Sequence, residues 1–279
     1  MRGKWIIADL DGTLLNSRQR IGDSTVRRIE LFRQNGGDIT IATGRTLISA
    51  KPYIEQLKIT MPVILFNGAK IYDPLQKVYW EEHFLPLPYT EMIMNLYSMT
   101  SVRFGLDLLV FVNERIFTPE MTDRISQISL KDGVHVEQLP YTSICGDWKR
   151  INKMMFLGGH QQIEQFRNYC KRVFLDLEPG ELNSVISEPG MLEVLPPGIN
   201  KGTACRRLLE MTEGTEERLV TVGDGLNDME MVSAFHGIAM NNAHPDLKKS
   251  ASWVTLRNND EDALVEVIDA IEQTKRVEP

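Results

Sequence analysis

Apolar runs that end in polar, glycine-containing turns alternate with helical stripes near the start of the chain. The pattern predicts strands over residues 5–8, 38–42 and 62–66. Helices are predicted between them, over residues 23–35 and 45–57. Continuous apolar strands separated by helices are typical of a parallel sheet that is covered on both faces. The sequence therefore predicts an α/β fold with a Rossmann-like, doubly wound parallel sheet.

The same alternation of strand and helix patterns returns in the last third of the chain. Apolar runs predict further strands of the same sheet, and periodic stripes predict the helices that separate them. The predicted strands are 191–195, 218–222, 237–240 and 253–254, and the predicted helices open at Lys201 and cover 229–232 and 261–274. Two separated halves of one α/β pattern indicate a single core that another segment interrupts.

The segment between the two halves has a less regular pattern of apolar and polar residues. A hairpin over 70–73 and 78–82 precedes it, and its own elements are irregular and separated by prolines and short loops. Strand-like pieces are 103–113, 134–139, 153–157 and 173–177, and helix-like pieces are 88–99, 118–131 and 161–172. We therefore expect a core of residues 1–82 and 196–279 and an inserted α+β domain of residues 83–195.

Two carboxylates follow the first strand. Asp9 and Asp11 are two positions apart, so a regular strand would direct both side chains to the same face. Neighbouring like charges are costly unless a cation lies between them, and Mg²⁺ prefers such oxygen ligands. The alternative is an acidic turn in which an Asp caps a helix. These residues alone leave both interpretations open.

Other polar residues recur at the predicted strand ends and helix starts: Thr43 with Gly44, Lys201, Asp224, Asn227 and Asp228. The carboxyl ends of parallel strands meet in one crevice, so these side chains are expected to lie together. This set of residues suits phosphoryl transfer. Carboxylates can bind a metal ion, a lysine supplies a positive charge, and hydroxyl or amide groups donate hydrogen bonds to phosphate oxygens. Each residue also has a simpler interpretation, as a turn, a solvated lysine or a helix cap. No P-loop pattern signals a nucleotide donor, which favours a carboxylate nucleophile.

Composition and charge restrict the partners. The chain has 42% hydrophobic and 25% charged residues and a net charge of −7, which argues against a nucleic-acid partner. The three cysteines form no metal-binding pattern, and reduced thiols favour a cytoplasmic protein. No apolar run approaches a membrane span, so no membrane partner is expected. A small anionic metabolite stays compatible with this composition.

Four segments together resemble the motifs of the haloacid dehalogenase superfamily. They are Asp9-Leu10-Asp11-Gly12-Thr13, Thr43-Gly44-Arg45, Lys201-Gly202 and Gly223-Asp224-Gly225-Leu226-Asn227-Asp228. Their order and the long insertion are similar to those of Cof-type (class IIB) sugar-phosphatase-like hydrolases, which have an α/β cap domain. Asn67-Gly68-Ala69 is a further match. The resemblance is specific over the two core halves and general over the cap.

The resemblance implies roles for these residues. Asp9 would be the nucleophile and an Mg²⁺ ligand, Asp11 the general acid and base with its backbone carbonyl on the metal, and Asp224 a metal ligand. The phosphoryl group would be held by the N–H groups of Leu10 and Gly44 and the side chains of Thr43, Lys201 and Asn227. Asp228, Thr13 and Arg45 would not react themselves but would orient the residues that do.

These roles lead to the hypothesis of an Mg²⁺-dependent phosphatase acting on small phosphorylated metabolites, with sugar phosphates as the family-level expectation. An aspartyl-phosphate intermediate is expected. A phosphomutase or phosphotransferase on the same core and a non-catalytic phosphate-binding module are the alternatives. A dinucleotide dehydrogenase is disfavoured because no complete GxGxxG follows a strand. Cap residues that could face the substrate are Arg103, Phe104, Trp148 and Lys149, although packing in the cap core or a place on the cap surface is the simpler interpretation of each.

Overall fold

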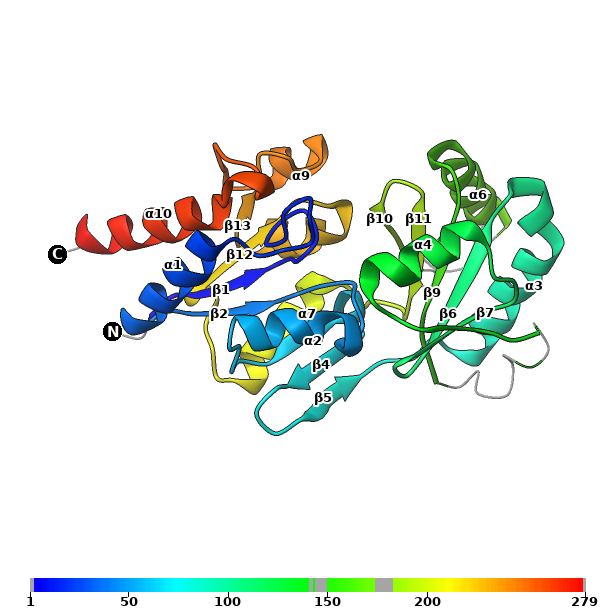
Figure 1. The fold of residues 1–279 in the computed structure, drawn as a ribbon, viewed down its shortest axis with the longest axis horizontal. Helices are drawn as coiled ribbons and strands as arrows, with labels where there is room; N and C mark the ends of the chain where they lie inside the picture. The colour runs from blue at the N-terminus through cyan, green and yellow to red at the C-terminus, as the bar shows by residue number, and fades with distance from the viewer. Residues whose placement is uncertain (1–2, 141–142, 144–149, 174–182, 278–279) are drawn as a thin grey trace. The chain divides into compact units, whose positions relative to one another are not determined.

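The computed structural model describes residues 3–140, 143, 150–173 and 183–277. The chain forms two compact units, and Figure 1 shows the helices and strands of each. One unit, the core, comprises residues 1–44, 50–81 and 200–279, and the other, the cap, comprises 45–49 and 82–199. The sequence analysis placed the boundaries at 82/83 and 195/196 and did not separate residues 45–49 from the core.

The core is built around strand β1 (Trp5–Ala8), which lies between β2 (Asp38–Ile41) and β12 (Leu219–Gly223) in a parallel sheet. The described strands of this sheet follow the order β14-β13-β12-β1-β2. A parallel bridge between Ala42 and Ile64 places β3 (Val63–Leu65) beyond β2. The α/β class with a doubly wound parallel core, predicted from the apolar runs, is confirmed.

Helices cover both faces of this sheet. Neighbouring residues Ile6 and Ile7 of β1 point to opposite faces, and both are fully buried. Ile7 belongs to an apolar cluster with Cys205 and Leu208 of α7 (Lys201–Met211). Helices α1 (Asp23–Gln34) and α10 (Ala263–Val277) contact each other, and Figure 1 shows them on one side of β1 and α7 on the other. Burial on both faces explains why these strands are apolar throughout.

The remaining core elements complete this pattern. They are α2 (Leu47–Gln56), β4 (Lys70–Asp73), β5 (Val78–Glu82), α8 (Met229–Ala234), β13 (His236–Ala239), α9 (Pro245–Ser250) and β14 (Trp253–Val254). Helix α2 begins in the cap unit and continues into the core, whereas β3, β4 and β5 form a small sheet of their own. Short 3-10 turns follow β3, at Phe66–Gly68, and β12, at Leu226–Asp228. These turns connect strand ends to the next element.

The cap has a separate sheet and a separate hydrophobic core. Its strand order is β10-β11-β9-β6-β7-β8, and most neighbouring pairs are antiparallel. Helices α3 and α6 bury Ile93, Phe104 and Phe166 against Met154 and Phe156 of β9. The elements are α3 (Leu87–Phe104), β6 (Asp107–Val112), β7 (Arg115–Thr118), α4 (Asp123–Asp132), β8 (Val136–Gln138), β9 (Ile151–Leu157), α6 (His160–Val173), β10 (Asn183–Glu188) and β11 (Met191–Leu195).

Three predictions for the cap were wrong in detail. The strand expected over 103–113 begins only at Asp107, because Arg103 and Phe104 close helix α3 before the left-handed Gly105. The helix expected over 118–131 begins at Asp123, after strand β7. The strand expected over 191–195 in the core sheet is β11 of the cap sheet, where it pairs antiparallel with β9 and with β10, a strand that was not predicted. The strand expected over 173–177 lies outside the described residues except for Val173, which ends α6.

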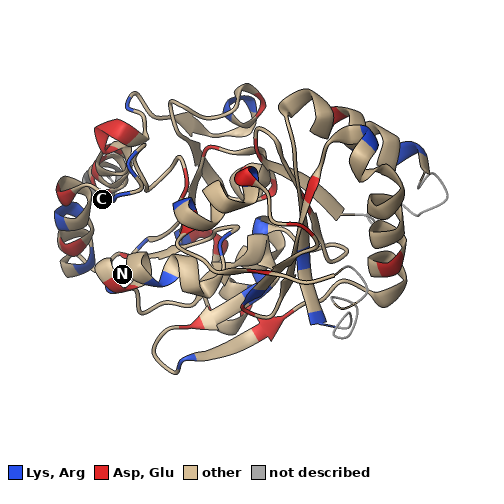
Figure 2. Ribbon diagram, turned by 45° about the vertical axis from the view of Figure 1, so that its right-hand side comes forward, with Lys and Arg blue, Asp and Glu red and all other residues tan. Residues whose placement is uncertain are grey.

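Charged residues of both signs are distributed over the chain. Figure 2 shows acidic and basic residues interspersed along the helices and strands rather than gathered in blocks of one sign. Among the described helices, none combines the length and the apolar character that a membrane crossing requires.

Candidate active site

The loop after β1 carries the first two carboxylates of the site. Asp9 is buried, and its backbone N–H donates to the Val222 carbonyl of β12 at 2.9 Å, so the sheet ladder fixes the residue. The chain then turns back, with the buried Leu10 carbonyl accepting the Leu15 N–H at 2.8 Å. Asp11 lies in this loop and is half-buried. The loop therefore holds Asp9 rigidly and leaves Asp11 closer to solvent.

Lys201 lies against two carboxylates. It begins helix α7, whose start is capped by the Asn200 side chain, and it is fully buried. Its Nζ lies 2.5 Å from Asp9 Oδ1 and 2.7 Å from Asp228 Oδ1. A buried ammonium needs such partners because desolvation of an unpaired charge is very costly. This contact excludes the simple interpretation of Lys201 as a solvated residue at a helix start.

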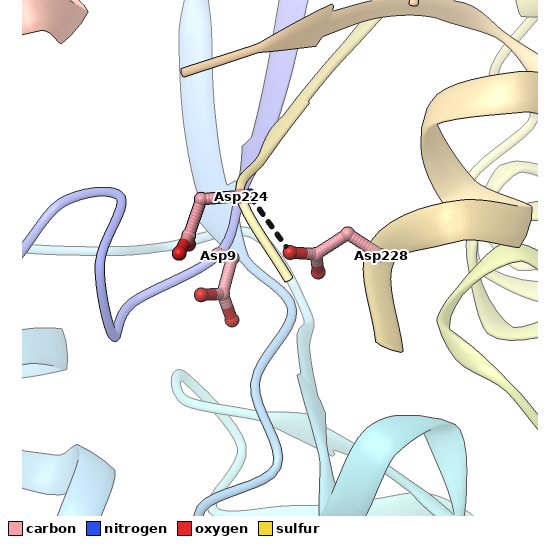
Figure 3. Close-up of side chains that lie close together, drawn as sticks. All are labelled: Asp9, Asp224 and Asp228. Atoms are coloured by element: carbon pink, nitrogen blue, oxygen red, sulfur yellow. Dashed lines mark hydrogen bonds between the residues drawn. The ribbon is translucent and has the colours of Figure 1, made fainter. Parts of the chain in front are cut away.

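Asp228 is fully engaged by the protein. One carboxylate oxygen accepts from Lys201, and the other accepts the N–H groups of Asp224 and Gly225, both at 2.9 Å. Figure 3 shows the hydrogen bond between Asp228 and the Asp224 backbone, with the Asp9 carboxylate nearby. Asp228 thus ties the loop after β12 to the lysine, which is how a supporting residue behaves.

Asp224 is held from the opposite side. Its Oδ1 accepts from the Thr13 hydroxyl at 2.7 Å. Gly12 has φ of +77°, and a Cβ there would lie 2.3 Å from Asp224 Oδ2, so only glycine fits this close approach. Burial, followed by repulsion from Asp228, raises the pKa of Asp224 to about 7. A carboxyl group with this pKa is only partly ionised near neutral pH.

Three carboxylates of the site could hold a cation. Asp9, Asp224 and Asp228 each offer an oxygen, and these oxygens lie within 4.8 Å of one another. Since both oxygens of Asp228 already accept hydrogen bonds, Asp9 and Asp224 are the better placed for direct ligation. The Asp11 side chain does not belong to this group of three. Hard oxygen donors of this kind fit Mg²⁺.

The charges of the site depend on one another. Burial raises the pKa of Asp9 well above its ordinary value, repulsion from Asp228, Asp224 and Asp11 adds to the rise, and Lys201 opposes it. Burial alone would lower the pKa of Lys201, but attraction to Asp228 and Asp9 outweighs burial and raises it. Lys201 therefore stays protonated and favours the ionised form of Asp9. A divalent cation would favour that form as well.

A second group of polar residues lies at the ends of β2, β3 and β12. Thr43 is buried, and its carbonyl accepts the Asn67 N–H at 2.9 Å. The Asn67 Oδ1 accepts from Asn227 Nδ2 at 3.1 Å. The amide of Asn67 also lies beside Gly44, where a Cβ would be 3.0 Å from its Nδ2. The tertiary structure thus gathers the Thr43–Gly44 turn and Asn227 around Asn67.

Asn67 was not among the predicted site residues. The signal was present in the sequence, because Asn67 and Gly68 form a polar turn after a buried strand, as Asp9 and Thr43 do. Only the hydrogen bond to Asn227, 160 positions away, distinguishes it from an ordinary turn residue.

Arg45 groups with the cap unit, whereas the other predicted site residues belong to the core unit. Its side chain donates to the Ser49 hydroxyl at 2.8 Å and lies 3.8 Å from a carboxylate oxygen of Asp132. Among the cap candidates, Phe104 packs against Phe166, with ring centroids 5.7 Å apart, and Arg103 lies over the Phe104 ring. Trp148 and Lys149 lie outside the described residues.

Comparisons with known proteins show the family to which the chain belongs. Residues 6–268 match the family model of the haloacid dehalogenase-like hydrolases. A solved haloacid dehalogenase-like hydrolase from Bacteroides thetaiotaomicron superposes with a TM-score of 0.80 at 27% identity, covering 97% of this chain and 100% of the other.

Two curated relatives are phosphatases. The 5-amino-6-(5-phospho-D-ribitylamino)uracil phosphatase YcsE of Bacillus subtilis is 29% identical over 95% of this chain and 94% of its own length. The HMP-PP phosphatase of Serratia proteamaculans is 29% identical over 86% of this chain and 84% of its own length. Both likenesses extend across the core and the cap.

Proposed function

The chain belongs to the family of haloacid dehalogenase-like hydrolases, and from that premise we propose that it is an Mg²⁺-dependent phosphatase of small phosphorylated metabolites. The observation that carries the proposal is the contact of Lys201 with Asp9, beside Asp224. It combines a candidate nucleophile, a protonated lysine and two carboxyls that could hold a metal in one buried place. The names of the relatives, which specify phosphatases of small phosphorylated substrates, support the same class.

The residues present fit a magnesium ion. Asp9 and Asp224 would hold it through their carboxylates, together with the Asp11 backbone carbonyl that the family resemblance implies. When bound, the ion neutralises phosphate oxygens and withdraws charge from the reacting phosphorus. Asp228 and Thr13 contribute by fixing the orientation of Asp224 through hydrogen bonds.

The reaction proceeds in two steps on the side chains of the loop after β1. Asp9 attacks the phosphorus through Oδ2, because its Oδ1 is held by Lys201. The ester bond breaks as Asp11 protonates the leaving oxygen, and an aspartyl-phosphate forms. Asp11 then takes a proton from a water molecule, which attacks the phosphorus and releases phosphate and Asp9. Asp11 suits both proton transfers because it is half-buried and water can reach it.

The replacement Asp9→Asn tests this function. The amide retains the shape of the side chain but cannot form the covalent intermediate, so we expect kcat to fall by about a thousandfold or more. The measurement is phosphate release from a panel of sugar and other small metabolite phosphates, with Mg²⁺ and after EDTA treatment. Asp23→Asn, at an exposed helix start, is the matched control and should retain full activity.

Undiminished activity of Asp9→Asn would exclude Asp9 as the nucleophile. Activity that survives EDTA would exclude the metal. Transfer of the phosphoryl group to a second sugar hydroxyl, without free phosphate, would identify a phosphotransferase instead.

A further inference from the structure

The turn after β3 has an unusual backbone. Phe66, Asn67 and Gly68 all have positive φ, at 52°, 53° and 104°. Glycine adopts such values freely and asparagine tolerates them, whereas an aromatic residue does so only when its surroundings impose the conformation. All three residues are buried. Consecutive left-handed residues in a buried turn are a recurrent feature of functional sites and call for a physical explanation.

The turn connects the segments that carry the active-site residues of the core. The Asn67 backbone donates to the Thr43 carbonyl at 2.9 Å, and the Asn67 side chain accepts from Asn227 at 3.1 Å. Gly68 lies against the start of α7. A Cβ added to Gly68 would be 2.4 Å from the carbonyl oxygen of Asn200, the residue before Lys201. One turn therefore aligns three strand-end or helix-start segments.

The Asn67 amide has a donor that no described residue uses. The side chain is 1% exposed, and Nδ2 is buried without a hydrogen-bond partner. Buried amide N–H groups are nearly always paired, so an unpaired one points to a ligand or a water molecule. Nδ2 lies beside Gly44, and Oδ1 is bonded to Asn227. The family resemblance implies that both neighbours, Gly44 and Asn227, bind phosphate.

We propose that Asn67 binds the phosphoryl group of the substrate, a role that rests on the proposed phosphatase function. Its Nδ2 donates to a non-bridging phosphate oxygen, and its Oδ1 at the same time orients the Asn227 amide toward that group. A phosphate oxygen is a pure acceptor, which suits an amide that has only its donor unused. The left-handed backbone of the turn is what directs the Asn67 amide between Gly44 and Asn227.

Two replacements of Asn67 separate the donor from the acceptor. Asn67→Gly removes the whole amide and accommodates the left-handed backbone. Asn67→Asp keeps an oxygen for Asn227 but turns the donor into a carboxylate oxygen that repels phosphate. The matched control is Glu213→Gly, another left-handed residue of the core unit, which is exposed and precedes Gly214, beside Trp5 at the start of β1. Steady-state kcat and KM, inhibition by inorganic phosphate and the thermal midpoint are measured for each.

We expect kcat/KM of Asn67→Gly to fall by about 100- to 1,000-fold, the range for one lost donor to a transition-state oxyanion. The inhibition constant of phosphate should rise by at least about tenfold, because one charge-assisted hydrogen bond is lost. Asn67→Asp should lose more than Asn67→Gly in both quantities. Glu213→Gly should stay within about twofold of the wild-type protein, because it lies beside the first residue of β1 whereas Asp9 follows the last.

Two results would overturn the proposal. In one, a folded Asn67→Asp retains wild-type kcat/KM and phosphate inhibition, which would show that Nδ2 does not touch phosphate. In the other, kcat falls while phosphate inhibition is unchanged, which would make Asn67 a structural residue of the turn. If Asn67→Gly fails to fold, the isosteric Asn67→Asp carries the test.

A double-mutant cycle with Asn227→Ala tests the shared contact. Because the two amides are bonded to each other, the losses of the single variants should not add, and the double variant should lose less than their product. Strict additivity would exclude the orienting role of Asn67 Oδ1. If the wild-type protein releases no phosphate from any substrate, the proposed function itself fails, whereas loss of activity in Asp9→Asn with full activity in Asn67→Asp rejects only the role of Asn67.

Discussion

Lys201 makes the clustering of carboxylates in this site tolerable. Asp9, Asp224 and Asp228 lie close enough for strong mutual repulsion, and Asp9 and Asp228 are almost fully buried. The ammonium compensates two of them directly, at 2.5 and 2.7 Å. Among the described residues Asp224 has no such contact with the lysine, and burial followed by repulsion from Asp228 raises its pKa. The pKa of Asp9 is raised as well, so a cation beside these two carboxyls would favour the ionised form of both.

The raised pKa of Asp224 predicts how pH changes stability and metal binding. Its pKa is about 7 in the folded protein and lower when unfolded, so the folded state binds more protons between these values. The metal-free protein should therefore lose stability as pH rises toward about 7. Mg²⁺ replaces that proton, so its stabilising effect should be larger near pH 8 than near pH 5.

Thermal unfolding with EDTA or with Mg²⁺ at the two pH values measures this effect. In Asp224→Asn, which cannot titrate there, the midpoint should depend less on pH and respond less to Mg²⁺. An equal Mg²⁺ effect at both pH values would contradict the assignment of Asp224 as a metal ligand.

Gly12 offers a test of the close packing around Asp224. Gly12→Ala places a Cβ 2.3 Å from the Asp224 carboxylate, whereas Gly36→Ala meets no atom within 4 Å at nearly the same φ, +82° against +77°. Both variants incur a backbone cost of about 1 kcal/mol. Only Gly12→Ala should displace Asp224, and we expect it to lose most of its activity and its stabilisation by Mg²⁺. Calorimetric titration with Mg²⁺ compares them directly, and equal affinities would refute the steric argument.

At the scale of elements, strands β9 and β11 of the cap carry a buried ion pair. Lys153 and Glu193 are 2% and 3% exposed, with Nζ and Oε2 2.6 Å apart. Lys153 also lies over the Phe111 ring, 4.5 Å from its centroid. Such a pair contributes little against a well-packed apolar pair, but removal of one partner leaves an uncompensated charge. The pair therefore specifies the register between strands more than it adds stability.

Replacement of one partner should show this asymmetry. We expect Lys153→Met to lower the free energy of unfolding by about 3–5 kcal/mol, and Lys153→Met/Glu193→Leu to recover most of the loss. Lys131→Met is the control, because it breaks the exposed contact of Lys131 with Glu188 at 3.0 Å and should cost less than about 1 kcal/mol. Urea unfolding measures all three. A double variant less stable than Lys153→Met would show that the charges contribute net stability.

At the scale of the whole molecule, the chain builds two hydrophobic cores, one in each unit. The carboxylates and Lys201 belong entirely to the core unit, whereas Phe166 packs in the cap against Phe104 and Phe156. The chain passes between the units at four places, after residues 44, 49, 81 and 199. Metal binding and cap packing therefore act on different cooperative units.

Calorimetry can resolve the two units. We expect Mg²⁺ to raise the unfolding temperature of one transition only, because it binds residues of the core unit. Phe166→Ala should lower the other transition, since removing a buried aromatic side chain costs about 3–5 kcal/mol. The unfolding temperatures are compared for the wild-type protein with Mg²⁺, the wild-type protein without Mg²⁺, and Phe166→Ala. A single transition that responds equally to both changes would show that the units unfold together.

The core was more predictable from the sequence than the cap. Strands such as β1 and β12 are buried on both faces, so their apolar runs and the polar residues that follow them are conspicuous. In the cap, the change from helix α3 to strand β6 falls within one partly apolar stretch, where Phe104 and Leu106 give no sign of the boundary. Local pattern does not separate helix from strand in such a stretch.

The order of the motifs along the chain determined the fold class and brought Asp9, Lys201 and Asp224 together as one predicted group. It did so because parallel topology places the carboxyl ends of strands at one edge of a sheet. Only the tertiary structure decided that Asp228 is occupied by hydrogen bonds, that Arg45 faces the cap unit's Ser49 and Asp132, and that Asn67 joins Thr43 and Asn227. Such contacts depend on distances between segments far apart in sequence, and no local pattern encodes those distances.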